Sequence, residues 1–268
     1  MAKTIILALL ATTVLYGGVL ALLYTMQRSL EYFPSKTNVG PVEAGVPEAE
    51  VIKLNTADGE TIVAWFLRRP GAYVAIYFHG NGNTLAQGPE RIIELADLGV
   101  SVLAVDYRGY GASTGTPTEA GIHLDADAAY AKALRLGFAA DHILLLGESL
   151  GSGVALELAS RRTVAGIILD SAYSSVVDVA AERYWMFPVR RLLIDQYRSD
   201  LWIAKIHVPI LMLHGTDDWT VPIKFGRRLA DLAGPNATFV AIPGGGHVVF
   251  DEAVAEESVK RWLAKFGL

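Results

Sequence analysis

Apolar residues fill the start of the chain with no polar periodicity. Between Thr4 and Met26 there is no charged residue, and most positions are Ile, Leu, Val or Ala. As a helix this run would be roughly 34 Å long, enough to cross a hydrocarbon core of about 30 Å. The pattern predicts one membrane-spanning helix, with residues 1–33 forming the anchor and its exit segment.

A cleaved signal peptide is the competing interpretation of this run. The run is longer than the usual signal core of about 7 to 15 residues, and no small-x-small cleavage site ends it, so its length favours a retained anchor. Lys3 precedes the run and Arg28 follows it. With the terminal amine, this gives a slight positive-inside bias that places the amino end in the cytoplasm. We therefore expect an extracytoplasmic domain, in a periplasm or lumen.

After the anchor, residues 34–48 contain Pro, Gly and Asn without hydrophobic periodicity, which is typical of a linker. Residues 49–268 then show short apolar runs alternating with helical patterns. The predicted strands are Val51–Leu54, Thr61–Leu67, Tyr73–Phe78, Val100–Val105, Ile143–Leu146, Val164–Leu169, Ile210–Leu213 and Thr238–Ile242. Predicted helices include Glu90–Leu98, Thr118–Leu136, Ser152–Ser160 and Ala253–Phe266. An initial hairpin followed by β-α units predicts an α/β domain, with a mostly parallel sheet covered by helices on both faces.

Composition narrows the possible functions. The 268 residues suit one large α/β domain beside the anchor. A formal net charge of -5 without a basic cluster gives no electrostatic reason to expect a nucleic-acid partner. There is no cysteine, which excludes disulfides, thiolate metal sites and a cysteine nucleophile.

Ser149 lies where the apolar strand Ile143–Leu146 gives way to a helical pattern, in the sequence Gly-Glu-Ser-Leu-Gly. A serine at such a sharp turn takes a strained conformation that only small neighbours accommodate, here Gly147 and Gly151. A glycine-rich turn without chemistry is the alternative, but the strand before and the helix after favour a nucleophile elbow. The amide of Leu150 would then open the helix and stabilise an oxyanion.

A second glycine-rich loop, His79-Gly80-Asn81-Gly82-Asn83, follows the strand Tyr73–Phe78. Glycines at a strand's carboxyl end let the backbone approach a ligand, so the Asn81 amide is the candidate for a second oxyanion donor. A turn that merely changes direction is the alternative, and the elbow elsewhere favours the oxyanion role. We expect His79 to be a hydrogen-bonded structural residue.

A serine nucleophile needs a base and an orienting acid, and in elbow-type hydrolases the acid and then the histidine follow along the chain, each after a strand. His247 is the only histidine beyond the acidic loop, so it is the expected base. Asp217 and Asp218 compete for the acid, and one of them would face solvent or cap the turn. Three further histidines fall in helix or strand-entry contexts and are expected to be surface or core residues: His123, His142 and His207.

Several motifs together resemble the α/β-hydrolase superfamily and, within it, the membrane-anchored bud-emergence-like hydrolases that include abhydrolase-domain protein depalmitoylases. The matching segments are Gln27–Leu30, Tyr32–Pro34, His79–Asn83, Asp106–Glu119, the elbow, Asp170–Ser175 and the two partner loops. The resemblance implies an α/β-hydrolase fold. It also implies that Asp218 is the acid of a His-Gly-x-x-Asp-x-x-Val-Pro motif, with Asp217 at a variable position.

The same resemblance implies a small helical cap in residues 171–207, a segment rich in Tyr and Trp. These aromatics could line an acyl pocket or meet the membrane, or they could be the buried stripe of crossover helices. We predict a membrane-anchored serine hydrolase for acyl lipids, acylated proteins or small esters, including thioesters. Its site is Ser149, Asp218 and His247, without metal or cofactor, and its oligomeric state is open.

Two other functions remain open on the sequence alone. The first is a serine aminopeptidase, which would need an acidic pocket for the substrate amine, supplied by Glu148, Asp178 or Glu182. The second is a non-catalytic membrane scaffold that kept the fold. The ordered set of Ser149, Asp218 and His247 argues against the scaffold.

Overall fold

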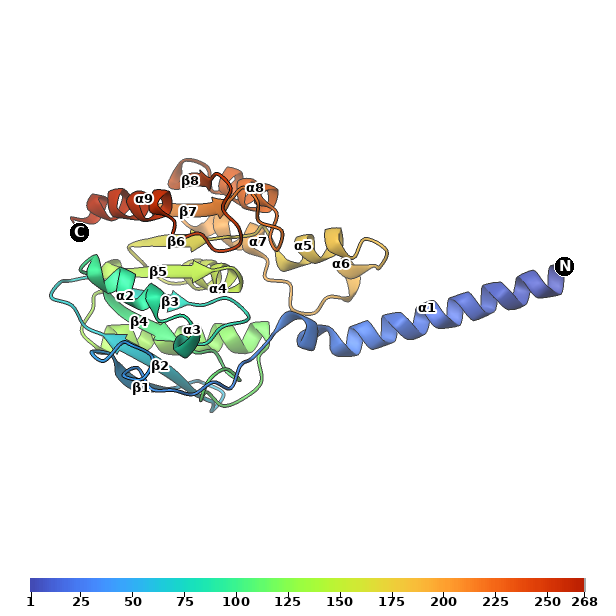
Figure 1. Cartoon of the computed structure of the whole chain (residues 1–268), viewed down its shortest axis with the longest axis horizontal. Helices are drawn as coiled ribbons and strands as arrows, with labels where there is room; N and C mark the ends of the chain where they lie inside the picture. Colours follow the sequence, from blue (N-terminus) through green and yellow to red (C-terminus); the bar gives the residue numbers. More distant parts are fainter. Residues whose placement is uncertain (268) are drawn as a thin grey trace.

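The domain is built on one eight-stranded sheet, seen in a computed structural model that describes residues 1–267 (Figure 1). The sheet order is β1-β2-β4-β3-β5-β6-β7-β8. β1 and β2 pair antiparallel, β2 pairs antiparallel with β4, and all other pairs are parallel. The strands are β1 Glu50–Asn55, β2 Thr61–Leu67, β3 Val74–Phe78, β4 Ser101–Val105, β5 Ile143–Glu148, β6 Gly166–Asp170, β7 Ile210–Gly215 and β8 Ala237–Ile242.

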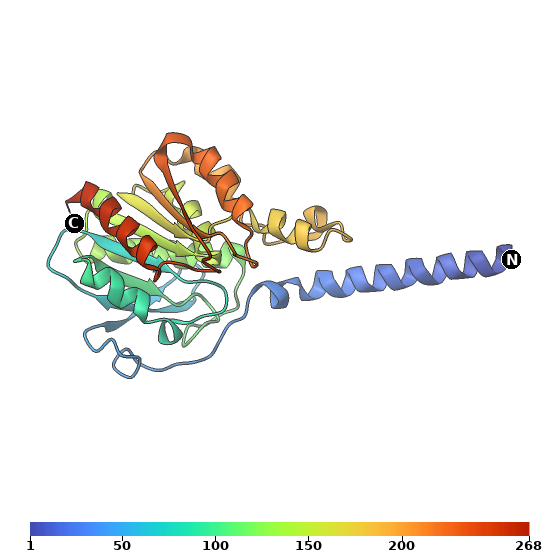
Figure 2. The same cartoon turned by 45° about the horizontal axis from the view of Figure 1, so that its top comes forward.

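Helices cover both faces of this sheet, which confirms the predicted layers (Figure 2). One core contains Leu145 and the inner sides of α3 (Glu119–Arg135), α4 (Leu150–Ala159) and α8 (Ile223–Ala233). The other core contains Leu144 and the inner sides of α2 (Glu90–Asp97) and α9 (Ala253–Leu263). Successive residues of β5 thus enter opposite cores, as the period of a strand requires.

Some predicted boundaries were wrong by one or two residues. β5 continues to Glu148 and β7 to Gly215, while β6 begins at Gly166 rather than Val164. The helical pattern predicted to end at Phe266 is α9, followed by a 3₁₀ turn over Ala264–Phe266. An apolar run predicts only the apolar part of a strand. The polar residue Glu148 also belongs to β5, because it pairs with Asp170 of β6.

The N-terminal helix α1 (Ala2–Glu31) projects away from the domain in both views (Figures 1 and 2). It is long and apolar enough to cross a membrane, a property that membrane anchors and signal sequences share. The chain between α1 and β1 forms no helix or strand, but burial and hydrogen bonds hold it against the domain. Tyr32 and Val46 are buried, and the N–H of Gly111 donates to the carbonyl of Ser35 at 2.8 Å.

Three short helices lie between β6 and β7, in the region where the cap is predicted. They are α5 (Val176–Arg183), α6 (Val189–Leu192) and α7 (Ser199–Trp202). Helices α5 and α6 extend from the domain on the same side as α1 (Figure 1). We call residues 171–207 the cap.

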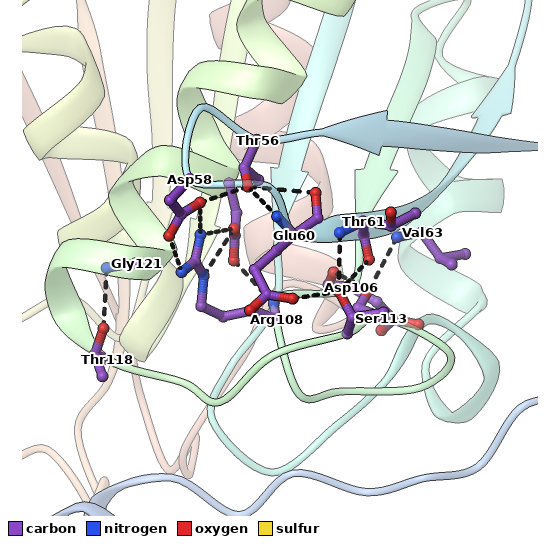
Figure 3. A network of polar contacts seen from close by, with 12 residues as sticks. Thr56, Asp58, Glu60, Thr61, Val63, Asp106, Arg108, Ser113, Thr118 and Gly121 are labelled. Atoms are coloured by element: carbon purple, nitrogen blue, oxygen red, sulfur yellow. Dashed lines mark hydrogen bonds and ion pairs between the residues drawn. The ribbon is translucent and has the colours of Figure 1, made fainter.

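The loop after β4 is held by one buried guanidinium (Figure 3). Arg108 donates to Asp125 of α3 at 2.9 and 3.0 Å and to Asp58 of the β1–β2 turn at 2.7 Å. In the same loop, Tyr110 donates its hydroxyl proton to the carbonyl of Asn81 at 2.8 Å. Arg108 therefore fixes a loop that positions the predicted oxyanion segment.

Candidate active site

Ser149 occupies a strained turn between β5 and α4. Its φ is 48° and its ψ is -114°. A Cβ added at Gly151 would lie 2.0 Å from the carbonyl oxygen of Phe78, and one at Gly147 would lie 2.4 Å from that of Gly151. Real Cβ atoms do not approach backbone so closely, so both positions require glycine. The turn therefore has the geometry that the motif predicts.

Three predicted residues from separate loops form one hydrogen-bonded relay, the Ser149–His247–Asp218 relay. The hydroxyl oxygen of Ser149 lies 2.9 Å from Nε2 of His247. Nδ1 of His247 lies 2.8 Å from Oδ2 of Asp218. The loops follow β5, β7 and β8, and because these strands are parallel, their carboxyl ends meet at one edge of the sheet.

The structure brings Asp218, and not Asp217, to the histidine. Asp218 is buried, and its Oδ1 accepts hydrogen bonds from the N–H groups of Thr220 and Val221, both at 2.8 Å. Burial alone would raise the pKa of Asp218, but the hydrogen bond and charge of His247, with the Val221 N–H, hold that pKa below its usual value. Asp217 is exposed and accepts a hydrogen bond from Thr216.

The backbone after His247 is tied to the end of β6 by two residues that the sequence reasoning missed. Oδ2 of Asp170 accepts hydrogen bonds from the N–H groups of Val249 and Phe250, each at 2.8 Å. The hydroxyl of Ser171 accepts one from the N–H of Val248, whose φ is 64°. The signal in the sequence that could have identified them is an Asp-Ser pair directly after the predicted strand Val164–Leu169. These bonds fix the histidine loop against the sheet.

Asn81 and Leu150, whose amides are the predicted oxyanion donors, line the same cavity as Ser149. Neither N–H donates to another group within residues 1–267, so both are free to bind an oxyanion. The end of α1 and the chain that follows it hold the Asn81 loop in place. Its side-chain amide donates to the carbonyl of Glu31 at 2.8 Å, and its own carbonyl accepts from the N–H of Phe33 at 3.2 Å.

His79 is buried at the base of this loop, outside the relay. Its Nδ1 lies 2.6 Å from the carbonyl oxygen of Gly80, and its Nε2 is 3.6 Å from Asp106. Burial lowers the pKa of His79 to about 4, so the ring is neutral at pH 7. The other predicted structural histidines lie away from the relay: His123 packs on Tyr197 and Trp202, His142 is half-buried against Tyr73, and His207 is exposed.

A cavity of about 460 Å³ opens beside Ser149, within the usual range of ligand pockets. Its walls are mostly apolar and come from α1, from the cap and from the loops around the nucleophile. Glu31, at the end of α1, also lines it, and both of its carboxylate oxygens are buried without a hydrogen-bond partner within residues 1–267. In the same part of the chain, no group of three or more His, Asp or Glu side chains is arranged to hold a metal ion.

A Ser-His-Asp relay at the carboxyl edge of a mostly parallel, helix-covered sheet is the architecture of α/β hydrolases. The chain belongs to the alpha/beta hydrolase fold family, whose model matches residues 74–193. It is 34% identical over 259 residues to an uncharacterised protein of Mycobacterium tuberculosis, covering 93% of this chain and 91% of that one. It is 31% identical to alpha/beta hydrolase domain-containing protein 17B of Xenopus tropicalis, over 74% of this chain and 69% of that one.

Solved structures share the fold at lower identity. The esterase Pf2001 of Pyrococcus furiosus superposes with a TM-score of 0.72 at 19% identity, covering 88% of this chain and 98% of that one. Est1E of Butyrivibrio proteoclasticus, solved with ferulic acid, gives a TM-score of 0.67 at 21% identity, over 80% of this chain and 98% of that one. These likenesses show that the fold is shared.

The elbow geometry predicts a steric penalty for Gly151→Ala. The added methyl group would overlap the carbonyl of Phe78, so we expect a loss of roughly 2 kcal/mol or more in the free energy of unfolding. Gly88→Ala is the matched control, because a Cβ there meets no atom within 4 Å. Urea unfolding of both variants measures the difference. Equal stability of the two variants would contradict the tight turn.

Buried His79 predicts a pH-dependent stability. Its pKa is about 4 when folded and near 6.5 in the unfolded chain, so the unfolded chain binds more protons between these values. The stabilising contribution is full above pH 6.5 and is lost as the pH falls towards 4. The stability advantage of wild type over His79→Gln should therefore shrink by about 3 kcal/mol between pH 7 and pH 4. Urea unfolding at both pH values tests this, and a constant advantage would contradict it.

Proposed function

We propose that this protein is a membrane-anchored serine hydrolase that cleaves ester or thioester bonds of apolar acyl groups. The observation that carries the proposal is the Ser149–His247–Asp218 relay beside a mostly apolar cavity. The relay supplies a nucleophile with its base, and the cavity offers space for an acyl chain. Family membership supports hydrolase chemistry, and the esterases that share the fold support ester bonds.

In this mechanism, the hydroxyl oxygen of Ser149 attacks the acyl carbon while its proton passes to Nε2 of His247. Asp218 holds the proton on Nδ1 and stabilises the charged imidazole. The amides of Asn81 and Leu150 bind the oxyanion, each contributing roughly 3 to 4 kcal/mol to transition-state stability. His247 then protonates the leaving alcohol or thiol as its bond to the acyl carbon breaks. Water attacks the acyl-enzyme by the same route, releasing the acid and restoring Ser149.

The aminopeptidase alternative is less well supported, because the three candidate acids are already paired. Glu148 binds Arg91 and accepts a hydrogen bond from Tyr77 at 2.7 Å. Asp178 binds Arg190 and Arg228, and Glu182 binds Lys224 at 2.5 Å. None of these three carboxylates is among the described residues that line the cavity. A free substrate amine could therefore bind one of these three acids only by displacing an existing cation.

The membrane part of the proposal rests on α1, which we take as a retained anchor. Gln27, Arg28 and Tyr32 at its carboxyl end make hydrogen bonds to the cap. A signal peptidase would have to cut before these residues to keep those bonds, inside the apolar run. We place the domain on the extracytoplasmic side, as the charge bias around the run predicts.

The relay predicts a sharp contrast between two neighbouring aspartates. In full-length protein assayed on 4-nitrophenyl butyrate and on a palmitoyl thioester, Ser149→Ala should abolish turnover. Asp218→Asn should lower kcat by on the order of 10³ to 10⁴, because the histidine loses its orienting carboxylate. Asp217→Asn, one residue away and exposed, is the matched control and should stay within about twofold.

Three outcomes would count against this mechanism. Turnover retained by Ser149→Ala would identify a different nucleophile. Equal losses in the two aspartate variants would remove the assigned role of Asp218. A wild type inactive on every ester and thioester would move attention to peptide substrates, and inactivity on peptides as well would favour the non-catalytic scaffold.

A further inference from the structure

One face of the anchor helix forms a wall of the cavity that contains Ser149. The residues of this face recur at helical spacings of three and four: Leu20, Leu23, Tyr24, Gln27, Leu30 and Glu31. Such spacing places them on one side of a helix. We call them the α1 stripe. Leu20, Leu23 and Gln27 are half-buried, whereas neighbouring Leu22 is exposed. The helix is therefore part of the site as well as a tether.

The cap forms the opposite wall. Val176, Val179 and Ala180 of α5 line the cavity, and Phe187 lines it as well. The two walls meet at the far end, where Phe187 stacks on Tyr16 with ring centroids 5.9 Å apart. The space between the α1 stripe and the cap is thus an apolar groove that runs from Ser149 towards the middle of α1.

Polar contacts fix α1 against the cap at the domain end of this groove. The side-chain oxygen of Gln27 accepts a hydrogen bond from the N–H of Ile194 at 2.7 Å. Arg28 forms an ion pair with Asp195 at 2.9 Å, and the hydroxyl of Tyr32 donates to the same carboxylate at 3.1 Å. Because both walls are held by these bonds, the groove is a built feature of the fold.

The tip of the cap presents large apolar side chains outward beside the helix. Trp185 is 78% exposed and Met186 is 62% exposed. The carbonyl of Met186 accepts a hydrogen bond from the hydroxyl of Tyr16 at 2.9 Å, which places the tip at the level of Tyr16. Tyr16 lies roughly 15 Å along the helix from Met26. If the run from Thr4 to Met26 spans the bilayer, the tip lies within one leaflet, where its exposure carries no hydrophobic cost.

We infer that the groove binds the acyl chain of a bilayer lipid ester, which enters sideways from the leaflet and presents its carbonyl to Ser149 without leaving the membrane. This inference rests on the proposed function. The groove begins between two surfaces placed in the leaflet and ends at the nucleophile, so a lipid reaches the site directly. Hydrolysis joins the acyl carbon to Ser149, releases the alcohol with the proton from His247, and then uses water to free the fatty acid. The acid leaves through the same groove.

The test compares two esters of one leaving group in vesicles. Full-length protein in phosphatidylcholine vesicles is given 4-methylumbelliferyl oleate or the corresponding acetate, and the oleate-to-acetate rate ratio is measured. Leu23→Trp fills the groove and should lower this ratio at least tenfold. Leu22→Trp, the same change one position along on the exposed face, should leave the ratio within about twofold of wild type. Ala180→Trp narrows the groove from the cap side and should also lower the ratio.

Each other result of this comparison has a defined meaning. Equal ratios in the Leu22 and Leu23 variants, with the Ala180 variant also unchanged, would overturn the groove as the acyl path. Wild type that cleaves the acetate but not the oleate would overturn the inference and leave the proposed function standing. Inactivity on both esters would overturn both. Faster cleavage of an S-palmitoylated peptide than of the oleate ester would assign the groove to acylated proteins instead.

The depth of the cap tip is measured without catalysis. Because the chain contains no cysteine, Met186→Cys and Val254→Cys each give one labelling site. Val254 lies on α9, away from the cap, and is 51% exposed. In vesicles of phosphatidylcholine with brominated acyl chains, a bimane label at position 186 should be quenched strongly and one at 254 should not. Equal quenching at the two positions would overturn entry from the leaflet.

Discussion

The site depends on one close backbone approach at the junction of β5 and α4. Ser149 can project its hydroxyl towards His247 because Gly147 and Gly151 let the strand, the turn and the end of β3 meet without a Cβ between them. A positive φ at a serine costs roughly 1 to 3 kcal/mol, so the surroundings must hold it. They do so because β5 is buried on both faces in the centre of the sheet and α4 packs against it. The loops that carry Asp218 and His247 follow β7 and β8, which lie further along the same parallel part of the sheet.

Much of this arrangement could be predicted from the sequence. The continuous apolar runs predicted the strands, and the Gly-x-Ser-x-Gly motif with its following acid and histidine predicted which loops would meet. Spacing alone could not show whether Asp217 or Asp218 contacts the histidine, because the two are adjacent in a turn. Which of them points towards the histidine depends on the backbone conformation of that turn. The choice depends on the N–H groups of Thr220 and Val221, which hold one carboxylate towards His247. The resemblance to a known motif pointed to the aspartate that contacts His247, but the physical reason for that contact becomes visible only in the fold.

Other contacts were beyond prediction because their partners lie far apart in the chain. An apolar run indicates a helix in a membrane, but it does not indicate which face of that helix meets protein. Gln27 and Arg28 bind a segment more than 160 residues further on. In the same way, the sequence shows Asp170 only as the end of a strand. The structure shows that it also binds the backbone of Val249 and Phe250. Long-range polar contacts of this kind leave no periodic signal.

The end of α1 also contacts the proposed oxyanion segment. The carbonyl of Glu31 accepts a hydrogen bond from the side chain of Asn81, and the N–H of Phe33 donates to the carbonyl of Asn81. The Asn81 loop is thus held on one side by the end of α1 and on the other by Tyr110. A domain truncated at Ser35 would keep the Ser149–His247–Asp218 relay but lose one wall of the cavity and half of the support of this loop. The full-length chain, with α1 included, is therefore the unit in which the proposed site is complete.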